Sequence, residues 1–436
     1  MRRPPAGRNP SVEGNPAMHP KLVVVLVVYL LIQSIENLVA LVNLKYLKRH
    51  GNKVPPGFTG FVEAGELARI QAYTLAQGRL DFVAAGLMAV VTLIFFFGPL
   101  LNWYNGWLAG LGLAPVAAGL LCFLLLSFAE TLLQMPTGLY HTFGIEERFG
   151  FNTQTLGLWL ADLAKSLLLS TVLLGLLLAG GFWLMGAAPH FWWLFFWMFF
   201  CGFSVFLLYL SPYVIEPLFN KFTPLDNPEL EEKIRLTLSM AGIAVARIFV
   251  MDASRRSRHG NACFSGIGRV KRIVLFDTLL TKSDPDEIVG ILAHEAGHWK
   301  KHHILQRLVV MELFALAACY LASRLVAGDT LASLFGLTTP TVYGKLLVLG
   351  FLGSLAGFVL RPLSNAWSRL HEWQADDFAT RLTNNGPALA TALVKLGRDN
   401  LANLHPHPWY VALHYGHPPL ADRVARLLNK GKRETA

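Results

Sequence analysis

Charged side chains are scarce in this chain of 436 residues, because Asp, Glu, Lys and Arg together make up only 15% of it. Soluble domains ordinarily carry about 25% charged residues. Cysteine is equally sparse: Cys122, Cys201, Cys263 and Cys319 are scattered, with neither a disulfide framework nor a paired metal-binding spacing. The composition therefore argues against an ordinary soluble enzyme and against a cysteine-based metal domain.

Apolar residues take the place of the missing charge, at 53% of the chain with a mean hydropathy of +0.43. They gather in runs of about 20 residues, the length that crosses a bilayer as a helix. Seven such spans are predicted, at 22–44, 82–101, 107–134, 166–187, 191–213, 305–327 and 342–363. Hairpins are predicted to turn at 102–106 and 187–190, and residues 1–21 are predicted to be a disordered tail.

The distribution of basic residues predicts how these spans are oriented. Lys and Arg concentrate in the segments 45–81, 135–165, 214–303 and 364–436, which the positive-inside rule places in the cytoplasm together with the C-terminus. This clustering beside apolar spans explains the net charge of +10 better than a nucleic-acid partner does.

Four ionisable residues fall within or at the ends of the predicted spans: Glu36, Glu130, Glu312 and Arg361. Such groups are costly in lipid and usually face the interior of a helix bundle or a wet cavity. We therefore expect a water-containing interior, while for Glu130 a misplaced span edge is the alternative.

A metal-binding pattern, His-Glu-Ala-Gly-His, lies at 294–298. Helix positions four apart share a face, so the imidazoles of His294 and His298 can bind one zinc ion. Glu295 is then placed to take a proton from a water molecule on the metal. We expect Ser283 to cap the start of this helix. The alternative is a solvated helix face, because a polar run at 300–303 follows directly.

A second motif, after the last predicted span, offers a third ligand. Glu372 and Asp376 share a face if the segment is helical, and Glu372 would complete the His-His-Glu set of many catalytic zinc sites. Asp376 could hold the outer nitrogen of a ligand imidazole. His371 points about 100 degrees away from Glu372 on a helix, so only one of the two can face the metal. An ordinary charged helix beside the membrane is the alternative.

The C-terminal tail holds His417 and Arg423, which could stabilise the oxyanion that forms when water attacks a carbonyl. Spacing alone favours the alternative, a loop followed by a solvated helix. Both interpretations remain open from the residues themselves.

The insert before the metal motif has the pattern of a small α+β unit. It predicts an amphipathic helix at 230–240, a strand at 247–251, and a hairpin of 261–265 with 272–277 around Gly266-Ile267-Gly268. An outer strand there could pair with an extended substrate, as many peptide-binding proteins do.

With these motifs the chain resembles the integral-membrane zinc metallopeptidases of the CAAX prenyl protease type, from about residue 22 onward. The resemblance rests on residues 143–152 with Thr155, on 215–222, on Asn261-Ala262, on 294–300, on the Glu372 segment and on 417–419. One departure is Cys263, where the family often has an aromatic residue, and it bears on substrate preference rather than on the chemistry.

The resemblance implies a seven-helix barrel that encloses a chamber, with one Zn²⁺ per chain near the cytoplasmic side. It implies His294, His298 and Glu372 as ligands and Glu295 as general base. It also implies that Asn261 and Ala262 hold the substrate backbone and that His417 and Arg423 lie near the scissile carbonyl. The substrates would be prenylated CAAX C-termini or other membrane-associated peptides.

The expected protein is thus a mainly α, multi-pass membrane endopeptidase with a zincin-like catalytic unit, and its partners are peptide substrates and the lipid bilayer. The predicted domains are a tail at 1–21, a five-helix membrane domain at 22–213, and a metallopeptidase domain at 214–436 that includes two further membrane helices and C-terminal cytoplasmic helices. Compact loops favour a bacterial-type plasma (inner) membrane with the site on the cytoplasmic side. The rival interpretation is a non-catalytic transporter or scaffold, although structural zinc is usually closed by four protein ligands.

Overall fold

The computed structural model of this chain describes residues 20–265 and 271–434. Residues 1–19 of the predicted tail and the predicted turn at 266–268 lie outside this part of the chain. Residues 20 and 21 already belong to the first helix.

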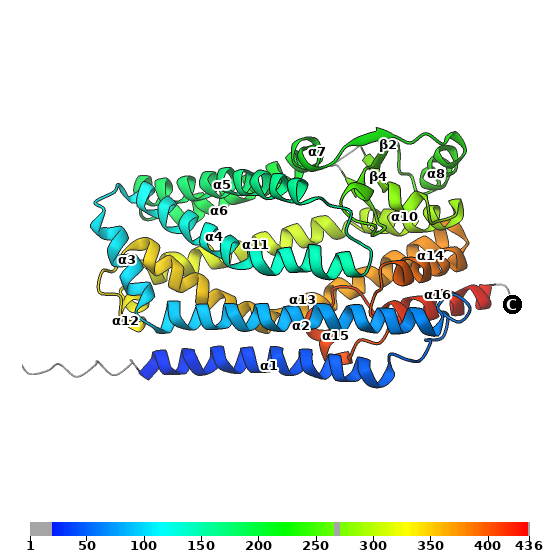
Figure 1. Cartoon of the computed structure of the whole chain (residues 1–436). Coiled ribbons are helices and arrows are strands. Elements are labelled where there is room, and N and C mark those ends of the chain that lie inside the picture. The colour runs from blue at the N-terminus through cyan, green and yellow to red at the C-terminus, as the bar shows by residue number, and fades with distance from the viewer. Residues whose placement is uncertain (1–19, 266–270, 435–436) are drawn as a thin grey trace, which may run out of the picture.

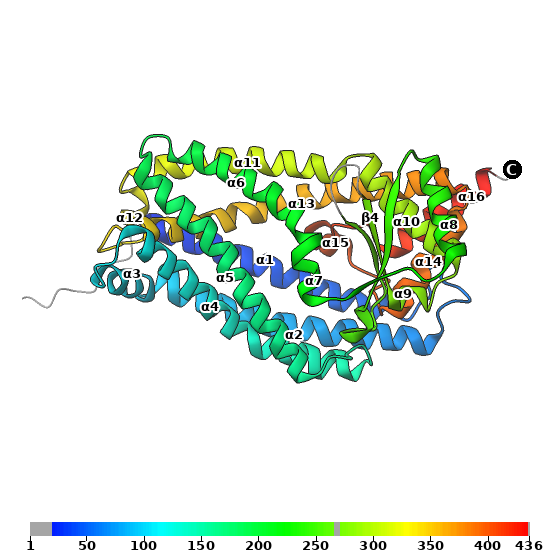
Figure 2. The ribbon, with the colours of Figure 1, turned by 90° about the horizontal axis from the view of Figure 1, so that it is seen from above.

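In the part of the chain that the structure describes, seven helices are long and apolar enough to cross a membrane, as the sequence predicts. They lie side by side along one direction (Figure 1; Figure 2). They are α1 (Pro20–His50), α2 (Ala64–Phe97), α4 (Pro115–Tyr140) with the π-helical turn η1 (His141–Glu146), α5 (Leu156–Ala187), α6 (Trp192–Leu210) with η2 (Ser211–Ile215) and α7 (Glu216–Phe219), α11 (His303–Ala327) and α13 (Val342–Thr383). Several run well past the apolar core, and α13, which is 42 residues long, extends into the polar end of the molecule.

The first predicted hairpin is wrong, because residues 102–106 lie within the short helix α3 (Leu100–Gly110). The chain turns after this helix, where Gly112 has φ +62°. Asn105 is almost fully buried and donates from Nδ2 to the Thr339 carbonyl at 2.6 Å. The polar residues of this segment therefore serve tertiary contacts and not a turn. The second predicted hairpin is confirmed, since α5 ends at Ala187 and α6 begins at Trp192.

A four-stranded sheet lies at the polar end, with the strand order β1-β2-β4-β3. Its strands are β1 (Phe222–Pro224), β2 (Val245–Met251), β3 (Ala262–Ser265) and β4 (Lys271–Phe276). The predicted hairpin is confirmed: β3 pairs antiparallel with β4, with Ala262 opposite Leu275. β2 runs parallel to β4. β1, which was not predicted, pairs antiparallel with the other edge of β2. β3 is therefore an edge strand among the described residues.

Most of the shorter helices lie at the polar end, whereas α12 lies at the opposite end of the molecule with α3 (Figure 1). They are α8 (Pro228–Met240), the 3₁₀ turn η3 (Ala253–Arg255), α9 (Asp277–Leu280), α10 (Pro285–Lys300), α12 (Thr330–Leu334), α14 (Gly386–Asp399), α15 (Pro408–His414) and α16 (Leu420–Glu434). The largest apolar core joins the sheet, α8, α10, α14 and α16 to the end of α2, so the polar end is one packed unit with the membrane helices.

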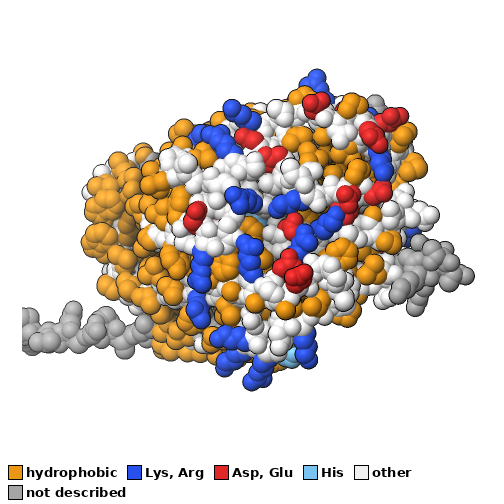
Figure 3. Space-filling model, turned by 45° about the vertical axis from the view of Figure 1, so that its right-hand side comes forward, with side chains coloured by type: hydrophobic (Ala, Val, Ile, Leu, Met, Phe, Trp, Pro, Cys, Tyr) orange, Lys and Arg blue, Asp and Glu red, His pale blue; other side chains and the backbone are white. Residues whose placement is uncertain are grey.

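The surface divides along the length of the molecule. Lys, Arg, Asp and Glu gather on the end that comes forward in Figure 3, and the part behind is almost wholly hydrophobic. Hydrophobic side chains exposed on the spanning helices are expected where the neighbour is lipid. The charged end carries the sheet, α10 and α16 (Figure 1).

The helices enclose two adjoining cavities, which confirms the expected interior space. One, of about 630 Å³, lies among α1, α2, α15 and the loop before α15, and the other, of about 940 Å³, among α1, α2, α4 and α13. Both are lined by Glu36, whose Oε1 lies 2.6 Å from Nη1 of Arg361. Glu130 lines the larger cavity from within α4.

Glu312 is held by a neighbouring helix. Its Oε2 accepts a hydrogen bond from Cys201 Sγ at 3.0 Å, and its backbone carbonyl accepts a hydrogen bond from Trp197 Nε1 at 2.9 Å. Both partners lie on α6, so this carboxylate is turned toward protein and not toward lipid.

Candidate metal centre

The helix that carries the His-Glu-Ala-Gly-His motif begins with a capping box one residue later than predicted. Asp284, not Ser283, is the N-cap, and its backbone N–H donates to Glu287 Oε2 at 2.9 Å. Pro285 follows at the first helical position, where no N–H is needed. Lys395 of α14 reaches Glu287 Oε1 at 2.8 Å and Asp284 Oδ2 at 3.1 Å.

α10 crosses α13 unusually closely at the motif glycine. A Cβ on Gly297 would lie 2.9 Å from the Cα of Ala375, nearer than van der Waals contact allows. Only glycine therefore permits this approach. The crossing sets the face of α10 that bears His294 and His298 against the face of α13 that bears Glu372.

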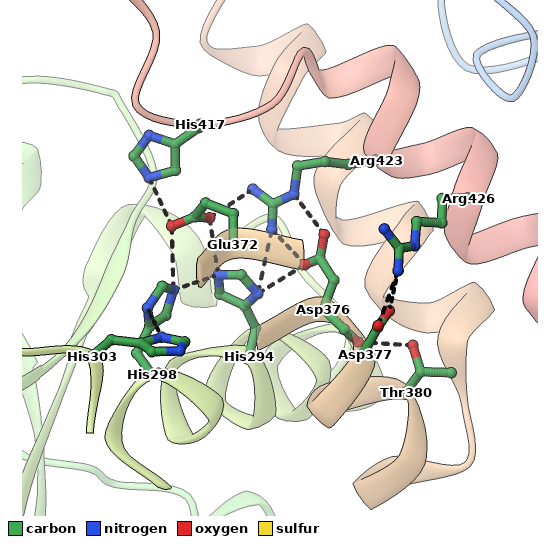
Figure 4. Close-up of polar contacts among 10 residues, drawn as sticks. All are labelled: His294, His298, His303, Glu372, Asp376, Asp377, Thr380, His417, Arg423 and Arg426. Atoms are coloured by element: carbon green, nitrogen blue, oxygen red, sulfur yellow. Dashed lines mark hydrogen bonds and ion pairs between the residues drawn. The ribbon is translucent and has the colours of Figure 1, made fainter. Parts of the chain in front are cut away.

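The three predicted ligands converge (Figure 4). Nε2 of His294 lies 3.3 Å from Nε2 of His298. The Glu372 carboxylate faces both, with Oε2 at 3.4 Å from His294 Nε2 and Oε1 at 3.2 Å from His298 Nε2. One ligand atom from each residue lies within 4.8 Å of the others.

The donor set suits a metal ion. Oε2 of Glu372 is buried and makes no hydrogen bond to the described residues, a costly state unless a cation or proton satisfies it. Two imidazole nitrogens and one carboxylate form a common catalytic zinc set and leave a fourth coordination position for a reactant. The residues therefore fit a zinc ion.

His294 has an anionic outer partner. Its Nδ1 lies 2.8 Å from Asp376 Oδ1, which is the contact that the predicted role of Asp376 requires. Burial would lower the pKa of His294, but the adjacent carboxylates of Asp376 and Glu372 outweigh burial and raise that pKa to about 9. The surroundings of this nitrogen thus favour a positive charge.

Arg423 balances the charge of Asp376. Its Nε donates to Asp376 Oδ2 at 2.9 Å and its Nη2 to Oδ1 at 2.6 Å, a bidentate pair with both side chains buried. The third nitrogen, Nη1, lies 3.5 Å from Glu372 Oε2. Burial opposes the charged guanidinium, but Asp376 outweighs it and raises the pKa of Arg423 further. Arg423 therefore connects Asp376 to the candidate ligand Glu372.

His298 has a neutral outer partner that the sequence analysis missed. Its Nδ1 lies 3.1 Å from Nδ1 of His303, and Nε2 of His303 lies 3.0 Å from Gln374 Oε1. His303 is 1% exposed, although it belongs to a polar run that could also indicate a solvated face. The residue before it, His302, has φ +57°. This left-handed turn places the side chain of His303 against His298. His371 is not aimed at the metal; its ring stacks on His303 at 3.9 Å.

Glu295 is partly buried beside the two ligand histidines. Burial raises the pKa of its carboxyl group. Among the described residues it makes no hydrogen bond or ion pair. A carboxylate with a raised pKa and no fixed partner can accept a proton more readily than an ordinary one.

The remaining predicted residues surround this centre. His417 extends over Glu372, with Nε2 at 3.4 Å from Oε1, and its side chain is 71% exposed (Figure 4). Asn261 and Ala262 lie at the start of the edge strand β3, next to α10. Oδ1 of Asn261 accepts from the Ala262 N–H at 2.8 Å.

Two family models match the chain in succession. The model described as CAAX prenyl protease N-terminal, five membrane helices, matches residues 43–221, and peptidase family M48 matches residues 224–430. Together they extend from the first membrane helix to the last helix.

Known proteins similar to this chain are spread over plants, fungi and animals. It is 33% identical to CAAX prenyl protease 1 homolog of Oryza sativa subsp. japonica, over 86% of this chain and 90% of the relative. It is 35% identical to CAAX prenyl protease 1 of Saccharomyces cerevisiae, over 70% of this chain and 71% of the relative. The crystal structure of S. mikatae Ste24p matches with a TM-score of 0.86 at 28% identity, over 95% of this chain and 100% of that chain.

Proposed function

We propose that this chain, which belongs to the CAAX prenyl protease group of peptidase family M48 and is thus a multi-pass membrane metalloendopeptidase, hydrolyses peptide bonds with one zinc ion per chain. Its membership and its mainly helical fold confirm what the sequence motifs predict. The proposal assigns His294, His298 and Glu372 as the ligands, and the convergence of these three side chains is the observation that carries it.

Zinc, when bound, supplies Lewis acidity that makes water a better nucleophile and polarises the peptide carbonyl. Glu295 takes the proton of the attacking water and later delivers it to the leaving amine. Its raised pKa and its freedom from other partners support this role. Asp376 and His303 keep the two imidazoles in the tautomers that present Nε2 inward.

His417 and Arg423 are proposed to stabilise the negative charge that develops on the scissile carbonyl oxygen. His417 is suited to direct contact, because its imidazole is exposed over the ligand carboxylate. Arg423 contributes a positive charge from behind the ligands, since two of its nitrogens are engaged by Asp376.

The proposed substrates are prenylated CAAX C-termini or other membrane-associated peptides. Among the described residues no strand pairs with the outer edge of β3 beside the metal centre, and an extended peptide can add to such an edge through backbone hydrogen bonds. Asn261 and Ala262 begin this edge. The cavity of about 940 Å³ is lined largely by apolar side chains and offers space for an apolar group attached to the peptide.

The proposed cytoplasmic location of the site rests on the charges of its loops, because the site lies at the end of the molecule where Lys and Arg gather. The domain division near residue 213 also remains a proposal. A bacterial-type plasma membrane is supported only by the compact loops, and the relatives named above are eukaryotic. Fractionation of the source cells with a tagged chain tests the membrane, and protease protection of the tag tests the orientation.

The decisive experiment uses the purified full chain with a farnesylated CAAX peptide and with casein. We expect cleavage that 1,10-phenanthroline abolishes and added zinc restores, and about one zinc per chain. Glu295→Gln should retain zinc and lose about 10²–10⁴-fold in turnover, the usual contribution of a general base. Undiminished turnover in this variant would remove Glu295 from the mechanism. If neither substrate is cut and solute crosses vesicles that carry the protein, the transporter interpretation replaces this proposal.

A further inference from the structure

The motif at 143–152 carries part of the family resemblance but supplies nothing to the proposed mechanism. Its Glu146 lies in η1, a π-helical turn, and is only 8% exposed. π-Helical turns are rare and occur often at functional sites. A buried carboxylate in such a turn requires partners, so its contacts show what the motif does.

Both oxygens of Glu146 are engaged by side chains from other parts of the chain. Oε1 accepts a hydrogen bond from Tyr73 of α2 at 2.5 Å. Oε2 lies 3.1 Å from Nε2 of His259. His259 is two residues before Asn261, so the motif is connected to the start of the edge strand.

The other ring nitrogen of His259 also faces an acceptor. Nδ1 lies 3.2 Å from Oδ1 of Asn400, just beyond α14. The same Oδ1 accepts from the Gly260 N–H at 3.2 Å, and this fixes which side of the amide faces the ring. Carboxylate and carbonyl oxygens only accept hydrogen bonds, so both ring nitrogens of His259 face acceptors and the ring is held from two sides.

The backbone around His259 is held as well. Its carbonyl accepts from Thr278 Oγ1 at 2.8 Å, and its ring stacks on Phe151 of the same motif with centroids 4.1 Å apart. The N–H of Arg258 donates to the Phe151 carbonyl at 3.0 Å. The motif therefore forms a scaffold along the segment that leads into β3.

We propose that the Glu146–His259 contact is a positioning device for the substrate strand. It joins α2, η1 and the end of α14 to the residue that leads into Asn261 and Ala262, and so fixes the distance between the edge of β3 and the metal centre. Tyr73 and His259 also line the cavity of about 630 Å³, which places the pair on the wall of the interior space. This inference rests on the proposed peptidase function, and in particular on β3 as the strand that binds the peptide.

The test is Glu146→Gln, which removes the charge and keeps the size of the side chain. With the farnesylated CAAX peptide, we expect KM to rise about tenfold while kcat stays within about threefold, the pattern of lost peptide binding. The matched control is Glu147→Gln. Glu147 bonds Asn152 and does not contact His259, so both constants should stay within about twofold of wild type.

A merely structural role would lower the melting temperature without separating KM from kcat, so melting temperature and zinc content are measured for each variant. If Glu146→Gln does not fold, Tyr73→Phe deletes one hydroxyl oxygen and should raise KM about threefold. Unchanged KM in a folded Glu146→Gln, or in Tyr73→Phe if Glu146→Gln does not fold, would overturn the positioning role. An equal change in Glu147→Gln would also overturn it. Absence of cleavage by the wild-type chain would instead overturn the proposed function itself.

Discussion

At the scale of single residues, the two ligand histidines differ in their outer partners. His294 faces the carboxylate of Asp376, whose charge Arg423 neutralises, whereas His298 faces the neutral ring of His303. If Nε2 of His298 binds the metal, its Nδ1 carries the proton and donates to Nδ1 of His303. His303 then donates from Nε2 to Gln374, so a chain of hydrogen bonds sets the tautomer of the ligand.

This chain of hydrogen bonds makes His303 a testable residue. We expect His303→Ala to lower zinc affinity about 10–100-fold, the usual cost of removing the outer partner of a metal ligand. Zinc affinity is measured by competition with a chromogenic chelator. The control is His302→Gly, which removes the neighbouring imidazole and suits the backbone at φ +57°, so zinc affinity should be unchanged. Equal losses in both variants would show that the turn, and not the imidazole of His303, matters.

At the scale of helices, the site depends on how closely α10 and α13 approach. The closest point is Gly297 against the Ala375 backbone. A methyl group there cannot be accommodated by a side-chain rotation, because the atom it meets belongs to the main chain.

We therefore expect Gly297→Ala to separate the two helices and to destabilise the fold by about 1–3 kcal/mol, the usual cost of overpacking. Zinc content should fall with it, because Glu372 moves away from the histidines. The control is Gly353→Ala on α13, where an added Cβ meets nothing within 4 Å, so zinc content should not change. Wild-type zinc content in Gly297→Ala would show that the helices can separate without loss of the site.

At the scale of the whole molecule, the ligands come from segments on either side of two membrane spans. α10 lies before the spanning helix α11, and Glu372 lies near the end of the spanning helix α13. A bound metal would therefore connect the segment before these two spans to the end of the second span. A ligand that binds only the folded state stabilises that state according to its concentration relative to its Kd.

Removal of the metal should therefore lower the melting temperature of the whole protein. At zinc concentrations of about 100 times Kd, the stabilisation is about 2.7 kcal/mol, which thermal unfolding in detergent can detect as a shift of the transition. Glu295→Gln should keep the shift, because Glu295 is not a ligand, and Glu372→Ala should lose it. A transition in the wild-type protein that does not respond to zinc or chelator would contradict this assembly.

The sequence determined those features that depend on neighbours along the chain. Apolar runs fixed the seven spans because lipid leaves a helix no alternative for its backbone hydrogen bonds. Spacing of four on a helix fixed the shared face of His294 and His298, and alternation fixed the β3–β4 hairpin. The third ligand followed from the chemistry of the two others.

Only the tertiary structure decided what depends on contacts between distant segments. Residues 102–106 form a helix and not a turn, and there Asn105 is hydrogen-bonded across to Thr339. His303 and the Glu146–His259 pair could not be predicted, because no local pattern distinguishes a polar side chain that is buried against a distant partner from one in water. The sequence by itself thus determined the candidate catalytic groups, and the packing of α10, α13 and the sheet decided which groups hold them in place.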